Sequence, residues 1–479
     1  MPLLNPADCE RGEHEVAAER DEHVNEVVVA ETTLQPEPEA WAARTPDREG
    51  PFEDLRRRTR TAMGLPEDET IVATGHQAGV WHPGILAKDL AISAFASRSS
   101  TGDHGVRAIH FIVDHDANDA GLVSYPTRDL TRGSWRLAPA ADGRCTRDRP
   151  ATRATPPPTD AIALPSVTTG LEAIHAAVTA QSDATDLAWQ MGLATATLAR
   201  PFTGEIPRHS MSRLLETPIG LELLDRMARD PEGCIEAHDA AIEADRRARA
   251  NGHRRLPRGV ARLLGHGSVR TLPLWRATTE GRRPVHVGDR LDPTECRPRA
   301  LMATALARLG GCDLFVHGLG GGVYDRAMED WIGRWLGPEA MKALAPATVA
   351  TADLRLPLEA TTGSDEPIAT PEGLHRLRSN PDLGRTDPPR RETLVARIDA
   401  APRRSDARRM AFKDLRREID RARERGHEEI ARYRDRLAAG REERRRRDVA
   451  LDRTWAFPLH ETKDVRRLAA DVEEAFELG

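Results

Sequence analysis

The hydrophobic pattern of residues 70–116 predicts a strand, a helix and a second strand. Residues 70–74 (TIVAT) form a short β-branched run, and residues 83–96 (PGILAKDLAISAFA) begin with proline and carry apolar side chains at helical spacing. Residues 107–116 (RAIHFIVDHD) add a continuous apolar run of the kind that is buried in a parallel sheet. This order predicts a right-handed βαβ unit and therefore an α/β fold.

Similar patterns on either side extend the predicted sheet. Residues 26–34 (EVVVAETTL) form a β-like run that precedes a helix over residues 52–63. Further along the chain, residues 269–275 and 312–322 are β-like, and the second run leads through glycines into a helix over residues 325–336. The chain thus contains two predicted units in which a strand, a glycine turn and a helix follow one another.

Helical periodicity dominates the rest of the chain. Residues 171–258 are largely helical, residues 406–447 form one long helix, and residues 460–476 form an amphipathic helix that we expect to dock on the body or on a partner. The long helix has an apolar stripe typical of a coiled-coil-like arm, which predicts dimerisation or intramolecular docking. The stripe consists of Ala411, Leu415, Ile419, Ala422, Ile430, Tyr433 and Leu437.

Composition narrows the class of protein. The 479 residues predict two or three domains, and 39% apolar with 30% charged residues fits a soluble protein. No apolar run of about 18 residues and no secretory signal is visible, so we expect no membrane segment and a cytoplasmic location. Five cysteines without a close pair predict reduced thiols. A net charge of −6 gives no reason to expect nucleic acid, so the expected partners are small molecules.

Two imidazoles follow the first predicted strand. His76 and His82 lie where we expect the strand to turn into a helix, and helix N-termini at such edges offer N–H groups to anions. These imidazoles would bind phosphate or stabilise the charge that develops when a nucleotide is cleaved. The alternative is that His76 caps or packs in the turn and His82 is a surface residue. Lys88, one turn into the helix, either reaches a phosphate or is solvated.

A second candidate site follows the next predicted strand. Asp114, His115 and Asp116 suit a metal site or a general acid or base, because a low-dielectric neighbourhood separates the pKa values of such groups. The alternative is a loop in which Asp116 and Asn118 make Asx turns. We favour a functional role, since charged residues directly after a buried strand are costly unless they are used.

The third candidate site is the glycine-rich stretch of residues 316–325 (VHGLGGGVYD). It offers flexible backbone to an anion or a ribose, with His317 and Tyr324 beside it, but it does not fit the dinucleotide fingerprint G-x-G-x-x-G. Upstream, Arg297 and Arg299 precede a predicted helix, so a guanidinium there would clamp a carboxylate or phosphate, or else lie on the surface. The glycines concerned are Gly318, Gly320, Gly321 and Gly322.

Together, residues 74–92, 108–121 and 296–325 resemble the cysteine-adding enzymes of bacillithiol biosynthesis in their order and spacing. The family pattern Thr-Gly-Gln-Gln followed by Gly matches Thr74, Gly75, Gln77 and Gly79, while His76 replaces a glutamine. The acidic-His-Asp motif of the family falls on residues 114–116.

The resemblance implies a Rossmann-like parallel sheet core with a largely helical insertion and a long C-terminal coiled coil associated with dimerisation. We therefore expect a homodimer. The expected organisation is a first part of the core (1–136), a linker (137–165), a helical insertion (166–265), a second part of the core (266–400), a helical arm (401–450) and an amphipathic tail (451–479).

The resemblance also implies an activity, the joining of cysteine to the amino group of a glucosaminyl malate. Cysteine would be activated through its carboxylate by ATP, with His76 and His82 assisting, and residues 114–116 would orient the amine or take its proton. Arg297 or Arg299 would hold an anionic group. Whether a metal takes part stays open.

The chain departs from the family in its third motif, where HGLGGGVYD lacks the proline and glutamate of Gly-Gly-Pro-Gly-Glu. The acceptor amine, the acid and the retention of activity therefore stay open. One alternative is a metal-dependent hydrolase with His76, His82 and residues 114–116 as ligands. The other is a non-catalytic binding or scaffold protein that uses the long helix.

Overall fold

The computed structural model describes residues 31–42, 50–99, 105–159, 162–250, 262–263, 270–358, 369–379 and 389–477. The chain divides into two compact units. The larger unit comprises residues 1–128, 132–357 and 452–479, and the smaller unit comprises residues 129–131 and 358–451. The first part of the predicted strand 26–34 lies outside the described residues.

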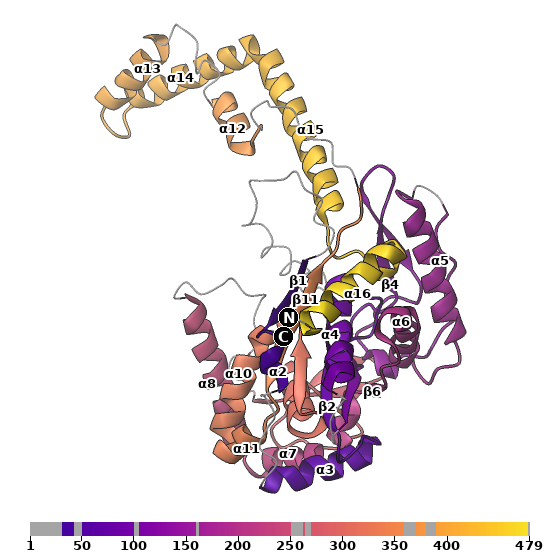
Figure 1. Cartoon of the computed structure of the whole chain (residues 1–479). Coiled ribbons are helices and arrows are strands. Elements are labelled where there is room, and N and C mark those ends of the chain that lie inside the picture. The colour runs from indigo at the N-terminus through magenta and orange to yellow at the C-terminus, as the bar shows by residue number, and fades with distance from the viewer. Residues whose placement is uncertain are drawn as a thin grey trace. The chain divides into compact units, whose positions relative to one another are not determined.

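A six-stranded sheet forms the centre of the larger unit (Figure 1). Five of its strands are parallel, and the edge strand β1 is antiparallel to its neighbour. The protein is thus mixed α/β with a mostly parallel sheet. Across the sheet the strands are β1 (Glu31–Gln35), β11 (Ala347–Asp353), β10 (Leu314–His317), β2 (Thr70–Gln77), β3 (Val106–Val113) and β6 (Arg208–Ser210).

The predicted βαβ unit is confirmed. β2 and β3 pair in parallel from Thr70 opposite Val106 to Gln77 opposite Val113, and helix α4 (Pro83–Ser99) connects them. Proline suits the first position of α4, because its φ is already helical and it has no N–H to leave unpaired. β2 extends three residues beyond the predicted end, so His76 lies in the strand and not in a turn.

Helices cover both faces of the sheet (Figure 1). The connections from β2 to β3 and from β10 to β11 run in opposite directions across the sheet, so right-handed crossovers place their helices on opposite faces. With α4 lie α2 (Glu39–Ala42), α6 (Leu187–Thr203) and α16 (Thr462–Glu477). On the other face lie α3 (Pro51–Met63), α7 (Pro218–Arg229), α8 (Pro231–Ala250), α9 (Ala300–Leu306), α10 (Leu319–Leu336) and α11 (Pro338–Ala343).

This reversal of direction creates a topological switch point between β2 and β10. In open parallel sheets the carboxyl ends of the two strands at such a point are the usual place for a ligand, because the connections diverge there and leave the strand ends uncovered. The first and third sequence motifs follow these two strands.

The predicted helical insertion is largely helical but belongs to the larger unit. Between α6 and α7, strand β6 pairs with β3 and extends the central sheet. The other elements of the unit are α5 (Pro165–Ala180), a sheet of β4 (Leu122–Pro126) and β5 (Arg132–Arg136), a sheet of β8 (Gly281–His286), β7 (Thr271–Thr278) and β9 (Cys296–Pro298), and the short helices η1 (Thr146–Asp148), η2 (Ser212–Glu216), η3 (Ala307–Gly311) and η4 (Phe457–Leu459).

The segment predicted as a linker or exposed loop, residues 137–165, is partly buried. Leu137, Cys145 and Thr146 are 0% exposed. The backbone N–H of Thr146 donates to the carbonyl of Asp116 at 2.8 Å, so this segment packs against the carboxyl end of β3. Its many prolines and polar residues limit regular structure to the short helix η1 but do not place the segment in solvent.

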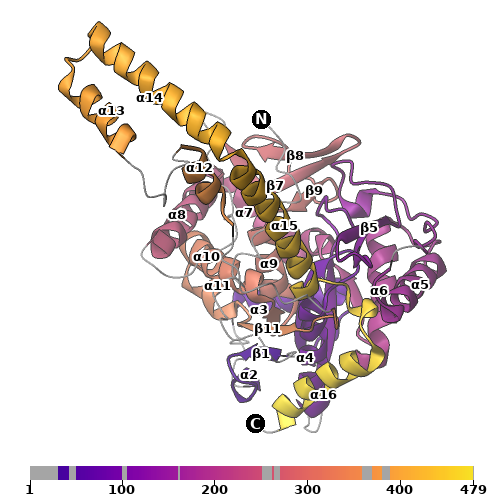
Figure 2. The same cartoon turned by 90° about the horizontal axis from the view of Figure 1, so that it is seen from above.

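The smaller unit contains α12 (Pro371–Ser379), α13 (Pro389–Ala400), α14 (Asp406–Arg425) and α15 (His427–Leu451), with α13 and α14 side by side (Figure 2). The prediction of one helix over residues 406–447 is wrong, because the helix breaks at Gly426, whose φ of −98° and ψ of 13° are not helical. Part of the apolar stripe docks within the unit. Ile430 and Leu437 are buried, and the Tyr433 hydroxyl accepts a hydrogen bond from the Thr370 N–H at 3.1 Å.

The predicted amphipathic helix near the C-terminus is confirmed as α16. It buries Val465, Leu468 and Val472 against α4, which is the expected docking on the body. Phe476 adds an edge-on contact with Trp41 at 5.1 Å between ring centroids. Among the described helices, none combines the length and apolar character needed to cross a membrane.

Candidate functional site

The three sequence motifs meet at the carboxyl end of the sheet. The Thr74 hydroxyl of β2 donates to the carbonyl of Val316 in β10 at 2.7 Å. The Gln77 amide donates to Asp116 Oδ2, just beyond β3, at 2.9 Å. These bonds tie the first motif to the third and to the second.

Lys88 reaches back from α4 to the same edge. Its side chain is 4% exposed, and Nζ donates to the carbonyl of Gly75 at 2.7 Å. Gly318 follows β10 directly, and a Cβ at that position would lie 3.9 Å from Lys88 Cδ. The solvated alternative for Lys88 is therefore wrong, and the ammonium lies beside the switch point.

His76 belongs to a buried stack of rings on the α4 side of the sheet. The Trp81 ring stacks on His110 at 4.7 Å between centroids and meets His76 edge-on at 6.1 Å. His110 Nδ1 lies 2.7 Å from Asp89 Oδ1, and Arg208 pairs with the other Asp89 oxygen at 2.8 Å. Sequence analysis missed His110, Asp89 and Arg208, which lie inside regular elements and carry no motif.

His82 caps helix α4. Its Nδ1 accepts a hydrogen bond from the Gly84 N–H at 3.1 Å, and its carbonyl accepts from the N–H groups of Ile85 and Leu86. These first N–H groups of α4 are thus used within the protein. The capping alternative was assigned to His76, but His82 is the cap. Gly79, with φ of +156°, supplies the turn between β2 and the cap.

Three imidazoles in this region, the half-buried His76 and His82 and the fully buried His110, have lowered pKa values that favour the neutral form at neutral pH. Burial, followed by Lys88 and His82, holds the pKa of His76 well below its usual value. Burial, with Arg453 and Lys88 nearby, lowers the pKa of His82 to about 3. The pKa of His110 falls to about 4, mainly through burial. Neutral imidazoles do not supply the positive charge that the sequence analysis expected of His76 and His82, so they can act here only as hydrogen-bonding groups.

Asp114 holds the backbone together. It is 4% exposed and accepts hydrogen bonds from the Ser212 N–H at 2.9 Å, the Ser212 hydroxyl at 2.8 Å and the Ser210 hydroxyl. Burial would raise its pKa, but His115 and the two serines outweigh burial and lower the pKa to about 2. These bonds fasten the segment after β6 to the end of β3, so Asp114 has little capacity left for a substrate.

Asp116 faces a different part of the protein. Arg282 Nη1, from β8, lies 3.1 Å from Asp116 Oδ1 and donates to the carbonyl of His115 at 3.0 Å. The His115 ring is buried, and its Nδ1 has no hydrogen-bond partner among the described residues. The Asn118 amide donates to the carbonyl of Ala78 at 2.8 Å. Asp116 and Asn118 thus bond to distant segments, which differs from the Asx-turn alternative.

The predicted glycine turn of the third motif is wrong, because helix α10 begins at residue 319 and includes three of the glycines. A Cβ at Gly321 would lie 2.4 Å from His317 Nδ1, and one at Gly322 would lie 2.7 Å from the Val349 side chain. A Cβ at Gly320 would have nothing within 4 Å. Two of these glycines therefore make room for neighbours, and Gly320 borders open space.

His317 lies against a carboxylate that sequence analysis missed, in a close contact without hydrogen-bond geometry. Its Nε2 lies 2.7 Å from Asp325 Oδ2, and Arg308 Nη1 lies 3.3 Å from Asp325 Oδ1. Burial raises the pKa of Asp325, but His317 and Arg308 outweigh it and lower the pKa. An imidazole held by an ionised carboxylate is suited to accept a proton. Tyr324 instead packs, partly buried, against the core.

The two candidate arginines have different partners in the structure. Arg297 is buried, so the surface alternative is wrong for it; it pairs with Asp148 at 2.9 Å and donates to the carbonyls of Thr294 and Cys296, which uses its Nη1 and Nη2 groups within the protein. Arg299 instead lies over the ring of Trp275, with Cζ 4.0 Å from the ring centroid.

The predicted site residues are divided between the two faces of the sheet. His76, His82 and Lys88 lie on the α4 side of the sheet, whereas Gln77 and His317 lie on the other side, because adjacent residues of a strand point to opposite faces. The two sets share only the carboxyl edge. In the described part of the chain, no group of three or more His, Cys, Asp and Glu side chains is arranged to hold a metal ion.

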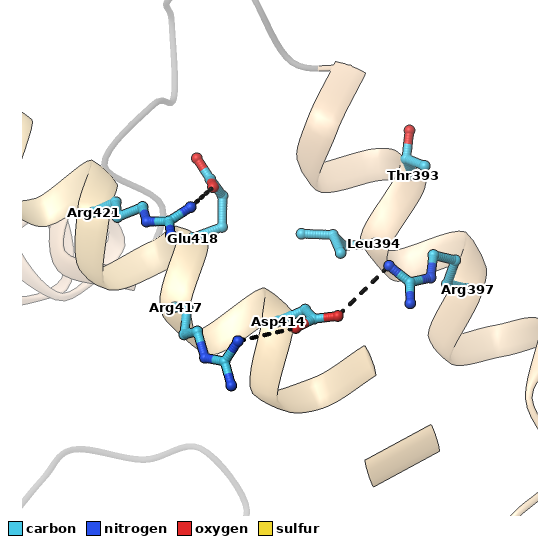
Figure 3. A pocket seen from close by; sticks show the side chains of 7 residues that line it. All are labelled: Thr393, Leu394, Arg397, Asp414, Arg417, Glu418 and Arg421. Atoms are coloured by element: carbon cyan, nitrogen blue, oxygen red, sulfur yellow. Dashed lines mark ion pairs between the residues drawn. The ribbon is translucent and has the colours of Figure 1, made fainter. Parts of the chain in front are cut away.

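A groove of about 600 Å³ lies elsewhere, between α13 and α14 of the smaller unit (Figure 3). Arg397 and Arg417 face Asp414 at 3.6 Å each, and Arg421 faces Glu418 at 3.8 Å. Only the pair of Arg397 and Asp414 joins the two helices, and the other two lie within α14; ion pairs near the surface contribute little energy and need no ligand. The groove therefore carries no argument for a catalytic site.

No protein-family model matches the chain, and no curated protein sequence matches it. The functional argument therefore rests on the geometry at the sheet edge. Its main features are the buried Lys88 beside Gly318 and the pair formed by His317 and Asp325.

Proposed function

We propose that the protein is a carbon–nitrogen ligase that joins cysteine to the amino group of an amino-sugar conjugate, as the resemblance to the bacillithiol enzymes implies. In this proposal the parallel sheet is a Rossmann-like core, and ATP is the co-substrate that activates the cysteine carboxylate. The observation that carries the proposal is the meeting of the three motifs at one sheet edge, through the hydrogen bonds of Thr74 and Gln77.

The amino end of α10 supports the binding of an anion there. No side chain caps this helix, and Lys88 lies beside its N-cap residue, Gly318. Uncapped N–H groups and a helix dipole favour negative charge, and a buried ammonium strengthens this preference. Gly320 leaves open space at the same turn. We therefore assign a phosphate of ATP or the cysteine carboxylate to this position.

His317 is the proposed base for the bond-forming step. The amine nitrogen attacks the carbonyl carbon of the activated cysteine, so a C–N bond forms and the bond from that carbon to the leaving oxygen breaks. The nitrogen then loses a proton, which His317 accepts while Asp325 stabilises the imidazolium. The sequence analysis expected residues 114–116 to take this proton. We assign the role to His317 instead, because the oxygens of Asp114 already accept hydrogen bonds.

A direct assay tests the proposal. Purified full-length protein is incubated with cysteine, ATP and a panel of amino-sugar conjugates, and mass spectrometry follows a product equal to the two substrates minus water. We expect Lys88→Met and His317→Ala to lower turnover by roughly 100-fold, the usual scale for loss of a catalytic acid, base or charge-stabilising group.

Two glycines of α10 supply a matched pair of variants. Gly321→Ala forces a methyl group against His317 and should reduce turnover, whereas Gly333→Ala makes only an ordinary contact with Met341, at 3.4 Å, and should retain it. Absence of product with every conjugate would contradict the proposed function. Equal turnover by Gly321→Ala and Gly333→Ala would show that the position of His317 is irrelevant.

A further inference from the structure

Besides Lys88, a second group of cations lies near Asp116. It consists of two arginines around the indole of Trp275 in β7. Arg299, at the start of α9, lies with Cζ 4.0 Å from the ring centroid, and Arg282 of β8 lies with Cζ 5.3 Å from it. Stacking on an aromatic face fixes the plane of a guanidinium and leaves its N–H edge available for hydrogen bonds. Both guanidiniums therefore lie within cation–π distance of the same indole.

The two guanidiniums differ in their partners. Arg282 bonds to Asp116 and to the carbonyl of His115. Arg299 has a buried Nε without a hydrogen-bond partner, and it forms no ion pair with a described residue. Burial, and then the charge of Arg282, lower the pKa of Arg299 to about 10. A buried donor without an acceptor is costly, so this position suits a ligand that supplies one.

The surrounding charges favour an anion. Arg282 pairs with Asp116 and Arg297 with Asp148, so these two guanidiniums are matched by two carboxylates and Arg299 is left in excess. Cys145 lies in the field of Asp148, Arg282 and Arg297, and it supplies no negative charge, because burial and Asp148 raise the pKa of its thiol to about 12.

We propose that Arg299, with Arg282 beside it, binds an oxyanion group of a ligand, either a carboxylate or a phosphate. The planar fork of a guanidinium matches the oxygen pair of either group. Asp116 connects this site through Gln77 to the first motif. Assigning the oxyanion to the amino-sugar conjugate rests on the proposed function, whereas the binding of an oxyanion does not.

Calorimetry with simple anions tests the site. Full-length protein is titrated with succinate, inorganic phosphate and the uncharged dimethyl succinate at fixed low salt. We expect Arg299→Gln to weaken binding of the preferred anion by roughly 10- to 100-fold, the range for loss of a charge-assisted hydrogen bond. The matched control is Arg283→Gln, the next residue of β8, which is exposed and pairs with Glu280. It should bind within about twofold of wild type, as expected for a screened surface charge.

Two further variants keep the result interpretable. The titrations are repeated in Lys88→Met, which removes the anion site proposed at α10. If Arg299→Gln does not fold, Arg299→Lys takes its place, because it keeps the charge but loses the fork and should still bind roughly tenfold more weakly. Melting curves establish which variants are folded.

The outcomes separate this proposal from the proposed function. Preference for succinate assigns a carboxylate, and preference for phosphate assigns a phosphoryl group. The proposal is overturned if neither anion binds, if Arg299→Gln binds both as wild type does, or if dimethyl succinate binds equally well. Anion binding that depends on Arg299 without any ligase product would leave this site standing and remove the proposed function. Product formation together with normal anion binding by Arg299→Gln would leave the proposed function standing and remove this anion site.

Discussion

His82 caps helix α4 and also carries an imidazole near the candidate site, so a single substitution can affect both stability and activity. Its Nδ1 caps α4 through the Gly84 N–H, and its ring lies in the field of Lys88 and Arg453 near the switch point. An alanine variant removes the cap together with the imidazole. The loss of a helix cap costs about 1 kcal/mol, so a fall in activity alone would not identify a chemical role.

Asparagine separates the two roles, because it caps helices well but lacks the ring. We expect His82→Ala to lower the free energy of unfolding by about 1 kcal/mol and His82→Asn to restore most of that loss. If the imidazole takes part in the chemistry, His82→Asn should still lose turnover by roughly 10²-fold to 10³-fold. Urea unfolding and the ligase assay measure the two effects. Normal turnover by His82→Asn would show that His82 acts only as a helix cap.

At the scale of elements, α16 closes one core of the larger unit. Leu468 is 0% exposed and Val465 and Val472 are buried with it against α4, the helix that carries Lys88. The packing of α16 therefore stabilises α4 from the side away from the sheet. This contact joins the C-terminal end of the chain to an element some 380 positions earlier in the sequence.

Leu468→Ala should destabilise the larger unit by about 2 to 5 kcal/mol, because it removes a fully buried side chain and leaves a cavity. Arg467 is exposed on the same helix, and Arg467→Ala should change stability by less than about 0.5 kcal/mol. Urea unfolding of the full chain measures both. Similar midpoints for the two variants would show that α16 does not depend on this contact.

At the scale of the whole molecule, the buried imidazoles make stability depend on pH. Burial is the largest cause in each case, lowering the pKa of His82 to about 3 and those of His110 and His460 to about 4. Below pH 6.5 the unfolded chain binds protons at these histidines while the folded chain does not. Acid therefore favours unfolding in this range.

We expect the free energy of unfolding to fall as the pH drops from about 6.5 to about 4, with a limiting slope of about 1.4 kcal/mol per pH unit for each such histidine. A second decline should follow below about pH 3.8, where Asp114, with its pKa of about 2, loses its stabilising hydrogen bonds. Urea midpoints between pH 7.5 and 4 measure the first decline. His460→Gln should make it shallower, and a flat profile would contradict the assignment.

Local patterns were sufficient for part of the fold, whereas the strands β4, β5, β6, β8, β9 and β11 were not predicted. β-branched apolar runs identified β2 and β3, Pro83 marked the start of α4, and helical spacing identified α16. These features depend on the period of a single segment, and each segment has only one period that buries its apolar side chains. The break at Gly426 and the early start of α10 were missed, since helix boundaries depend on caps and neighbours as well as on period.

The candidate site depended on contacts between distant segments. Arg297 and Arg299 are the same residue type two positions apart, yet only Arg297 meets a carboxylate, because Asp148 comes from a segment about 150 residues away. Likewise, Asp114 accepts three hydrogen bonds from two serines, Ser210 and Ser212, whereas Asp116 pairs with Arg282. The sequence by itself determined the strands β1, β2, β3, β7 and β10, several helices and the types of reactive group. The tertiary structure alone decided which groups are already paired, because hydrogen bonding and burial depend on neighbours that no local pattern specifies.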